Sequence, residues 1–240
     1  FSQVEIVISL FYGSILRYKR NNPKYKDRDR LIISKGHSAM GIYPILADIG
    51  YFSKKELKKY GTPQGILRIY GDKSIPGIDA TSGSLSQAPG IACGFCLAAK
   101  RDKKDIKSFL VLSDGEHYEG SLWESAMFAS HNNLDNLICI IDRNKQIILG
   151  KDSECLNLEP LGEKWKSFGW TVVDTNVVVD VVVGPFEAQQ LLAHGQHELR
   201  RDGNVDHLLL VVVAGLEGGA TQAQHRSDPG LRGPRHVPVT

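Results

Sequence analysis

Apolar residues recur along the first part of the chain at intervals of three and four. Val4, Val7, Ile8, Phe11 and Ile15 follow this spacing, which places them on one face of a helix. The pattern predicts an amphipathic helix within residues 4–19. A basic, polar loop is predicted from there to residue 30.

Shorter apolar runs farther along predict strands separated by helices. Residues 31–33, 108–112 and 137–141 are largely apolar runs of strand length. A helix is predicted at 119–131, so residues 108–141 read as a βαβ unit, which builds parallel sheets with helices on both faces. The sequence therefore predicts an α/β fold: a parallel β-sheet flanked by helices, with strands 108–112 and 137–141 as neighbours.

Other local sequence signals predict the remaining helices and a long loop. Helices are predicted near residues 40–49 and 90–100. Ser53 and Glu56 have the spacing of a capping box, which predicts a short helix from residue 53. Residues 61–90 are rich in Gly, Pro, Ser and Thr, and a loop of this length inside a domain is usually functional or disordered.

The composition changes abruptly near residue 177. Residues 1–176 contain 17 Lys, whereas residues 177–240 contain no Lys, Ile, Tyr, Trp, Cys or Met. We therefore expect one domain at 1–176 and a divergent tail at 177–240. Within the tail, Val177–Val183 and Leu208–Ala214 have the apolar character of strands, and the polar end beyond Gly218 predicts disorder. The chain opens without Met, so we expect a fragment of a longer protein.

Charge and cysteine content narrow the classes of function. A net charge of +2 favours neither nucleic acid nor a membrane surface as a partner. No apolar run approaches the roughly 20 residues of a transmembrane helix. Four cysteines are too few for a disulfide scaffold, which favours a cytoplasmic location. Cys93 and Cys96 form C-x-x-C inside an apolar helical stretch, so we interpret them as buried structural residues rather than a redox or metal pair.

Two polar residues follow the ends of the two best-defined strands. Asp114 and Asn144 come just after the apolar runs at 108–112 and 137–141. The carboxyl ends of parallel strands meet at one edge of a sheet, where ligands bind. A carboxylate and an amide oxygen held there suit a hard cation such as Mg²⁺. The alternative is structural, with Asp114-Gly115 as a turn and Asn144 as a strand-end cap, and the spacing alone does not separate the two.

The segment around these residues resembles the thiamine-diphosphate motif of transketolases. That motif is Gly-Asp-Gly, about thirty residues, then Asn, and it is matched by Ser113-Asp114-Gly115 and Asn144. The enclosed Glu119-Gly120-x-x-Trp123-Glu124 narrows the similarity to transketolases, especially the separate amino-terminal subunits of split enzymes. Other segments that resemble the family in the right order are Arg28–Arg30, Ser34–His37, Gly50–Phe52, Ile75–Gly77, Ser82–Leu85 and Trp165–Trp170.

The resemblance implies a thiamine-diphosphate-binding fold over residues 1–176 and assigns roles to individual residues. Asp114, the side chain of Asn144 and the backbone carbonyl of Gln146 would bind Mg²⁺. Gly115 would offer its amide to the diphosphate. His37 would lie near the diphosphate and thiazolium and act in catalysis. Gly83, Ser84 and Leu85 would line the cofactor.

The resemblance also implies an activity and partners. The family transfers a two-carbon ketol unit from a ketose phosphate to an aldose phosphate. Its cofactor lies between two chains, and a glutamate that this chain lacks acts on the aminopyrimidine. We therefore expect an oligomer with a complementary carboxy-terminal, pyrimidine-binding subunit.

Some positions depart from the family pattern. Ser113, Ser86 and Ala88 stand at positions that are usually glycine, Pro89 follows, and no Gly-His-Pro segment occurs near residues 66–70. These departures leave two alternatives open. One is a catalytically inactive protein that keeps the fold, and the other is a different thiamine-diphosphate enzyme such as a deoxyxylulose-phosphate synthase.

Overall fold

A parallel βαβ core organises the chain, as the apolar runs predict. In the computed structural model, which describes residues 3–175 and 208–214, strand β2 (Ser108–Ser113) leads through η3 (Asp114–Tyr118) and α4 (Gly120–His131) to β3 (Leu137–Arg143). The two strands pair in parallel, with Val111 opposite Ile140. The predicted parallel pairing is therefore confirmed.

The described strands form one five-stranded sheet in the order β1-β2-β3-β7-β6. Strand β1 (Arg30–Ile33) pairs in parallel with β2. Strand β7 (Leu208–Ala214) lies between β3 and β6 (Trp170–Thr175) and is antiparallel to both. The strand expected at 208–214 is thus present, and it makes the sheet mixed. Its apolar run suits a central position in either direction.

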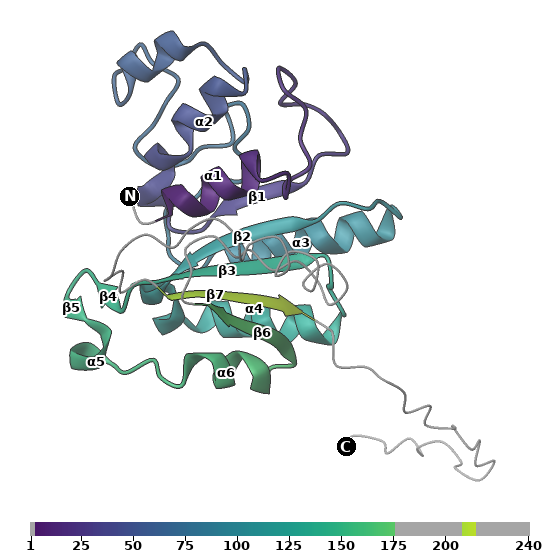
Figure 1. The fold of residues 1–240 in the computed structure, drawn as a ribbon, viewed down its shortest axis with the longest axis vertical. Coiled ribbons are helices and arrows are strands. Elements are labelled where there is room, and N and C mark those ends of the chain that lie inside the picture. The colour runs from purple at the N-terminus through teal and green to yellow at the C-terminus, as the bar shows by residue number, and fades with distance from the viewer. Residues whose placement is uncertain (1–2, 176–207, 215–240) are drawn as a thin grey trace, which may run out of the picture.

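Helices cover both faces of this sheet (Figure 1). On one face, α1 (Val4–Tyr12) and α2 (Tyr43–Asp48) pack with Phe109 and Val111. On the other, α3 (Ala88–Arg101), α4 and α6 (Leu161–Ser167) pack with Leu110 and Leu112. Successive strand residues point to opposite faces, so these strands are apolar throughout because both faces are buried.

Smaller elements complete the described part. They are η1 (Gly36–Gly41), η2 (Lys54–Lys59), the hairpin of β4 (Gln146–Ile147) and β5 (Gly150–Lys151), and α5 (Asp152–Cys155). Residues 60–87 contain no helix or strand, as their composition predicts. Cys93 and Cys96 are buried within α3, as expected. Among the described helices, none is both long and apolar enough to cross a bilayer.

Two predicted helical features differ from the structure. Helix α1 ends at Tyr12 rather than near residue 19, because Gly13 follows and Ser14 adopts a left-handed φ of 60°. Glu56 does not complete a capping box with Ser53. Its carboxylate instead accepts hydrogen bonds from Lys59 Nζ at 2.7 Å and from the Ile66 amide at 3.3 Å.

The remaining predictions for the tail concern other residues. A strand at Val177–Val183 and disorder beyond Gly218 both lie outside the described residues, and the domain boundary at residue 176 stays a prediction.

Candidate functional site

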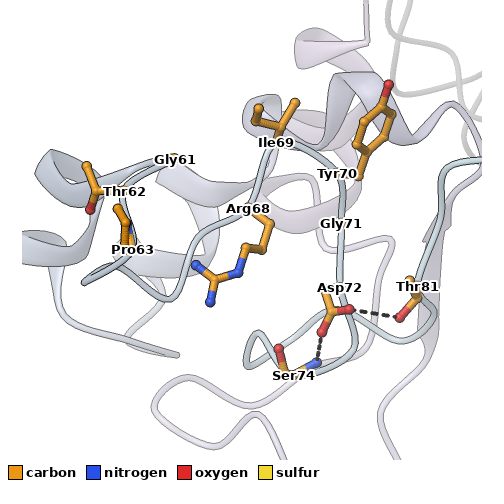
Figure 2. A pocket seen from close by; sticks show the side chains of 10 residues that line it. All are labelled: Gly61, Thr62, Pro63, Arg68, Ile69, Tyr70, Gly71, Asp72, Ser74 and Thr81. Atoms are coloured by element: carbon orange, nitrogen blue, oxygen red, sulfur yellow. Dashed lines mark hydrogen bonds between the residues drawn. The ribbon is translucent and has the colours of Figure 1, made fainter.

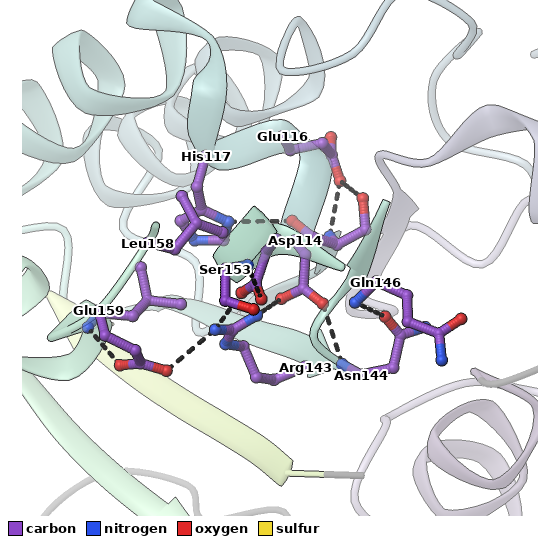
Figure 3. A network of polar contacts seen from close by, with 12 residues as sticks. Asp114, Glu116, His117, Arg143, Asn144, Gln146, Ser153, Leu158 and Glu159 are labelled. Carbon is purple, nitrogen blue, oxygen red and sulfur yellow. Dashed lines mark hydrogen bonds and ion pairs between the residues drawn. The ribbon is translucent and has the colours of Figure 1, made fainter. Parts of the chain in front are cut away.

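Four chain segments meet at the carboxyl edge of the parallel strands. They follow β1 (residues 34–37), precede α3 (82–86), follow β2 (113–116) and end β3 (142–146). Every residue predicted to act in the site lies on one of these segments. Figure 3 shows part of this edge, where Asp114, Asn144 and Gln146 lie close together.

The side chain of Glu116 joins three of the four segments. It is fully buried, and its Oε1 accepts hydrogen bonds from the Ser34 hydroxyl and from the Ser86 amide at 3.2 Å. Its Oε2 accepts from the amide of Ser113 at 2.8 Å and from the Ser113 hydroxyl at 3.1 Å. Burial raises the pKa of Glu116, whereas these hydrogen bonds lower it. Glu116 therefore fixes the ends of β1 and β2 against the loop before α3.

Ser113 and Glu116 also form the capping box of η3. The sequence carries this signal as Ser-x-x-Glu directly after a strand, although the predicted capping box is the one at Ser53 and Glu56. There the Ser53 hydroxyl oxygen accepts from the Lys55 amide at 3.3 Å, but Glu56 does not complete the box.

Asp114 lies at the centre of a second buried network. Its Oδ1 accepts from Arg143 Nη1 at 2.8 Å, and its Oδ2 accepts from the Asn144 amide at 3.0 Å. The Nη2 of Arg143 also pairs with Asp152 at 2.5 Å and with Glu159 at 2.9 Å. Burial raises the pKa of the Asp114 carboxyl, although Arg143 opposes that shift. Desolvation lowers the pKa of Arg143, but the surrounding carboxylates outweigh it and raise the pKa above its usual value.

A buried ion pair links the segment of His37 to the end of β3. Lys35 Nζ pairs with Asp142, and both side chains are about 95% buried. The next residue, Gly36, lies against the loop before α3, since an added Cβ would stand 2.9 Å from the Gly83 amide nitrogen and from the Ser82 carbonyl carbon. Only glycine permits this close approach of the two backbones. The position of His37 relative to Gly83 is therefore set by backbone contact.

The imidazole of His37 itself is exposed on η1. Desolvation lowers its pKa, and the positive charge of Lys35 lowers it further. The ring is thus neutral at pH 7 and available to accept or donate a hydrogen bond. Sequence reasoning selected the residue, and the structure places it beside the loop that carries Gly83, Ser84 and Leu85.

Two of the predicted metal ligands, Asn144 and Gln146, lie where β3 gives way to the β4–β5 hairpin. Asn144 is partly buried, and its Oδ1 accepts from the Gln146 amide at 3.0 Å. Gln146 begins β4. An added Cβ at Gly115 would meet only Ile147 Cγ2, at 3.8 Å, so the backbone of Gly115 is open to approach. Asp114, Asn144 and Gln146 are therefore joined by a chain of hydrogen bonds through the backbone.

His117 connects this edge to an aromatic cluster under α4 and α6. Its Nδ1 lies 2.9 Å from the Ser113 carbonyl oxygen, and its Nε2 accepts from the indole N–H of Trp165 at 3.1 Å. Trp123, Phe168 and Trp170 complete the cluster. Burial lowers the pKa of His117 to about 4, and the neutral ring, with its proton on Nδ1, satisfies both contacts.

The comparisons with known proteins identify the family. Residues 1–186 match the family model described as transketolase, thiamine diphosphate binding domain. The chain belongs to the transketolase family.

Two curated relatives and one solved structure show the extent of the similarity. The chain is 36% identical over 170 residues to one of the subunits of an apulose-4-phosphate transketolase of Phocaeicola vulgatus, covering 71% of this chain and 60% of the relative. It is 40% identical over 167 residues to a 6-deoxy-6-sulfo-D-fructose transketolase subunit of a Clostridium species, covering 69% and 61%. A transketolase of Campylobacter jejuni superposes with a TM-score of 0.63 at 29% identity, covering 69% of this chain and 27% of that one. The chain thus spans less than two thirds of the length of either curated relative.

The structure accommodates two departures from the transketolase pattern. Ser86, where the family usually has glycine, adopts a left-handed φ of 58°. Its hydroxyl donates to the Glu116 carbonyl at 2.7 Å, so a buried hydrogen bond accompanies the strained backbone. Pro89 lies in the first turn of α3, where the missing N–H has no intrahelical partner to lose.

A further departure is the lack of a Gly-His-Pro segment near residues 66–70. Part of this stretch lines a cavity of about 610 Å³ (Figure 2). Arg68 and Tyr70 line it, and the buried Tyr43 hydroxyl donates to the Arg68 carbonyl at 2.8 Å. The neighbouring Gly71 carbonyl accepts from the Ser82 amide at 3.0 Å. The cavity therefore adjoins the loop that carries Gly83, and it offers a guanidinium group rather than an imidazole.

Proposed function

We propose that this chain supplies the diphosphate-binding side of a thiamine-diphosphate and Mg²⁺-dependent transketolase. The reaction is transfer of a two-carbon ketol unit from a ketose phosphate to an aldose phosphate. The observation that carries the proposal is the meeting of Asp114, Asn144 and Gln146 at the carboxyl edge of the parallel strands, beside the segment of His37.

The residues at this edge fit a hard cation. Asp114 offers a carboxylate, Asn144 an amide oxygen and Gln146 a carbonyl oxygen, and Mg²⁺ prefers such oxygen donors. No three His, Cys, Asp or Glu side chains gather as a metal site among the described residues. A cation held here would therefore draw further oxygen ligands from the diphosphate, as Mg²⁺ sites commonly do.

The chain's own groups would position the cofactor and the substrate. Gly115 has an open backbone, and its amide would donate to a diphosphate oxygen. Gly83, Ser84 and Leu85 would line the rings of the cofactor, and neutral His37 would hydrogen-bond to the substrate. Bound thiamine diphosphate would supply the nucleophilic carbon that breaks and re-forms the carbon–carbon bond.

A complementary subunit completes the proposal. Both curated relatives are named as subunits of transketolases, which supports a pyrimidine-binding partner chain and an oligomeric enzyme. Their names also specify a sugar phosphate and a sulfo-sugar, which supports phosphorylated or similarly anionic sugars as the substrate class.

Calorimetry with thiamine diphosphate and Mg²⁺ tests cofactor binding by the full chain. We expect binding that requires Mg²⁺. Replacing Asp114→Asn removes the one anionic ligand and should weaken binding by about 1.5–3 kcal/mol, the range for contacts to a charged group. Asp102→Asn, an exposed carboxylate at the end of α3, is the matched control and should bind like the original chain.

Activity assays then separate the remaining alternatives. The chain alone should show no ketol transfer and should gain it when a complementary pyrimidine-binding subunit is added. Cofactor binding without activity in the complex would favour an inactive relative. No binding of thiamine diphosphate by the original chain would overturn the proposal.

A further inference from the structure

A second, strongly basic pocket lies beside the edge strand β1. Its volume is about 420 Å³. The charged side chains that line it are Lys24, Lys26, Arg28, Arg30, Lys73, Lys104 and Asp79. Six cations and one anion surround this hollow, in a chain whose net charge is only +2.

This basic pocket is separate from the candidate cofactor site. Arg30 is the first residue of β1, and Lys104 lies between the end of α3 and the start of β2. Both positions are at the amino edge of the parallel strands, whereas the candidate site is at the carboxyl edge. In Figure 1 the chain between α1 and β1 projects from the end of the sheet opposite the β4–β5 hairpin.

The centre of the basic pocket is partly buried and is held by ion pairs. Arg28 donates two hydrogen bonds to Asp79, at 2.8 and 2.6 Å. Arg30 shares this carboxylate only through a longer contact of 3.8 Å from its Nε. The Arg30 side chain is 80% buried. One carboxylate therefore faces two guanidinium groups.

The electrostatic balance at Arg30 reflects this shortage of negative charge. Burial lowers its pKa and Arg28 lowers it further, against the opposing effects of Asp79, Asp29 and Asp27. A largely buried cation in this situation is stabilised by any additional anion that reaches it.

The rim of the basic pocket carries further positive charge. Lys24, Lys26, Lys73 and Lys104 are exposed, and none of them takes part in the ion pairs between described residues. Tyr25 and Phe95 also line the wall. The rim can thus contact several anionic oxygens at once, and the wall can cover an apolar part of a ligand.

We propose that the basic pocket binds a small polyanion that carries two or more phosphate groups. Its volume falls within the roughly 300–1,000 Å³ of small-molecule sites. Several cations around one hollow favour a ligand with concentrated charge, since phosphate oxygens accept hydrogen bonds from Arg and Lys together. A nucleic acid would instead require basic residues spread along an extended face.

The test is calorimetry of the full chain with inorganic pyrophosphate, without divalent cations. The charge reversal Lys24→Glu with Lys104→Glu should weaken binding about tenfold or more, since two charge-assisted contacts are lost. Lys55→Glu with Lys58→Glu reverses two exposed lysines of η2 and should leave the affinity unchanged. If circular dichroism shows that the charge reversal disturbs folding, the neutral variant Lys24→Gln with Lys104→Gln is used in its place and should also weaken pyrophosphate binding.

A further control locates the bound pyrophosphate. His37→Ala alters the candidate cofactor site and should not change pyrophosphate binding. The proposal is overturned if His37→Ala weakens pyrophosphate binding as much as the pocket variants do, or if the pocket variants do not weaken it. Tighter binding of a short oligonucleotide than of pyrophosphate would also overturn it.

Discussion

Arg143 donates to Asp114 at 2.8 Å, and both side chains are at least 98% buried. The pair joins the residue after β2 to the last residue of β3, so the carboxyl ends of two parallel strands are held by one ion pair. Asp114 is also the central candidate for cofactor binding. The same guanidinium therefore supports the fold and orients the carboxylate.

Removing Arg143 should be strongly destabilising. Arg143→Met leaves Asp114 and Asp152 buried without their cation, and breaking a buried pair on one side costs about 3–5 kcal/mol. Urea unfolding at pH 7 measures the loss. The double variant with Asp114→Asn should recover part of it, because the uncompensated charge is then gone. Lys58→Met, at an exposed residue, is the control, and an equal loss there would contradict the expectation.

Glu116 should tolerate even a neutral isostere poorly. In Glu116→Gln the amide group replaces one accepting oxygen and faces N–H or O–H donors of Ser34, Ser86 or Ser113. The cost of leaving a buried donor unsatisfied is about 1–3 kcal/mol. Thermal or chemical unfolding measures it. Glu163→Gln, whose carboxylate is largely exposed, should change little, and similar stability of both variants would rule out the joining role of Glu116.

His117 should make stability depend on pH below neutrality. Its pKa is about 4 in the fold and about 6.5 when unfolded. Between these values the unfolded chain binds more protons, so the free energy of unfolding falls as pH drops from 6.5 to 4. The contribution reaches roughly 3 kcal/mol.

His117→Gln isolates this contribution, because glutamine can donate and accept but does not titrate. Unfolding free energies measured between pH 7 and pH 4.5 should fall less for this variant than for the original chain. The exposed His131→Gln should follow the original chain. Parallel curves for all three proteins would show that His117 is not the titrating group.

At Ser86 the left-handed backbone should make a glycine variant more stable than an alanine variant, which is the reverse of their usual order. Both Ser86→Ala and Ser86→Gly lose the hydroxyl, but only alanine keeps a Cβ at a left-handed φ, which costs about 1–2 kcal/mol. The glycine variant should therefore be the more stable of the two by about 1 kcal/mol. At Ser84, whose φ is not positive, glycine should gain no such advantage, and the same ranking at both positions would refute the argument.

The sequence predicted those parts of the molecule that depend on local patterns. The apolar runs at 108–112 and 137–141 define β2 and β3, and Asp114 and Asn144 lie at their ends as the spacing indicates. The sequence alone did not show that Arg143 would turn inward to Asp114, because an arginine at the end of a strand is usually exposed. Its burial depends on carboxylates at Asp152 and Glu159 that come from later elements.

Two predictions about helices are wrong for different reasons. A capping-box spacing at Ser53 and at Ser113 looks alike in sequence, yet only Ser113 follows a buried strand that fixes the direction of the chain. The helix expected to reach residue 19 stops at Tyr12 because Gly13 and Ser14 leave helical geometry, although Leu16 beyond them is still buried. The strand before Ser113 decides the first case, and the local backbone geometry of Gly13 and Ser14 decides the second.

The position of β7 between β3 and β6 affects how the chain can fold during its synthesis. Strand β3 is synthesised more than sixty residues before β7, so a nascent chain must hold the hydrogen-bonding edges of β3 and β6 open until β7 emerges. Open apolar strand edges of this kind pair with strands of other chains, which leads to aggregation. A chain ending near residue 175 would keep them permanently, and we expect it to be less soluble than the chain that contains Leu208–Ala214.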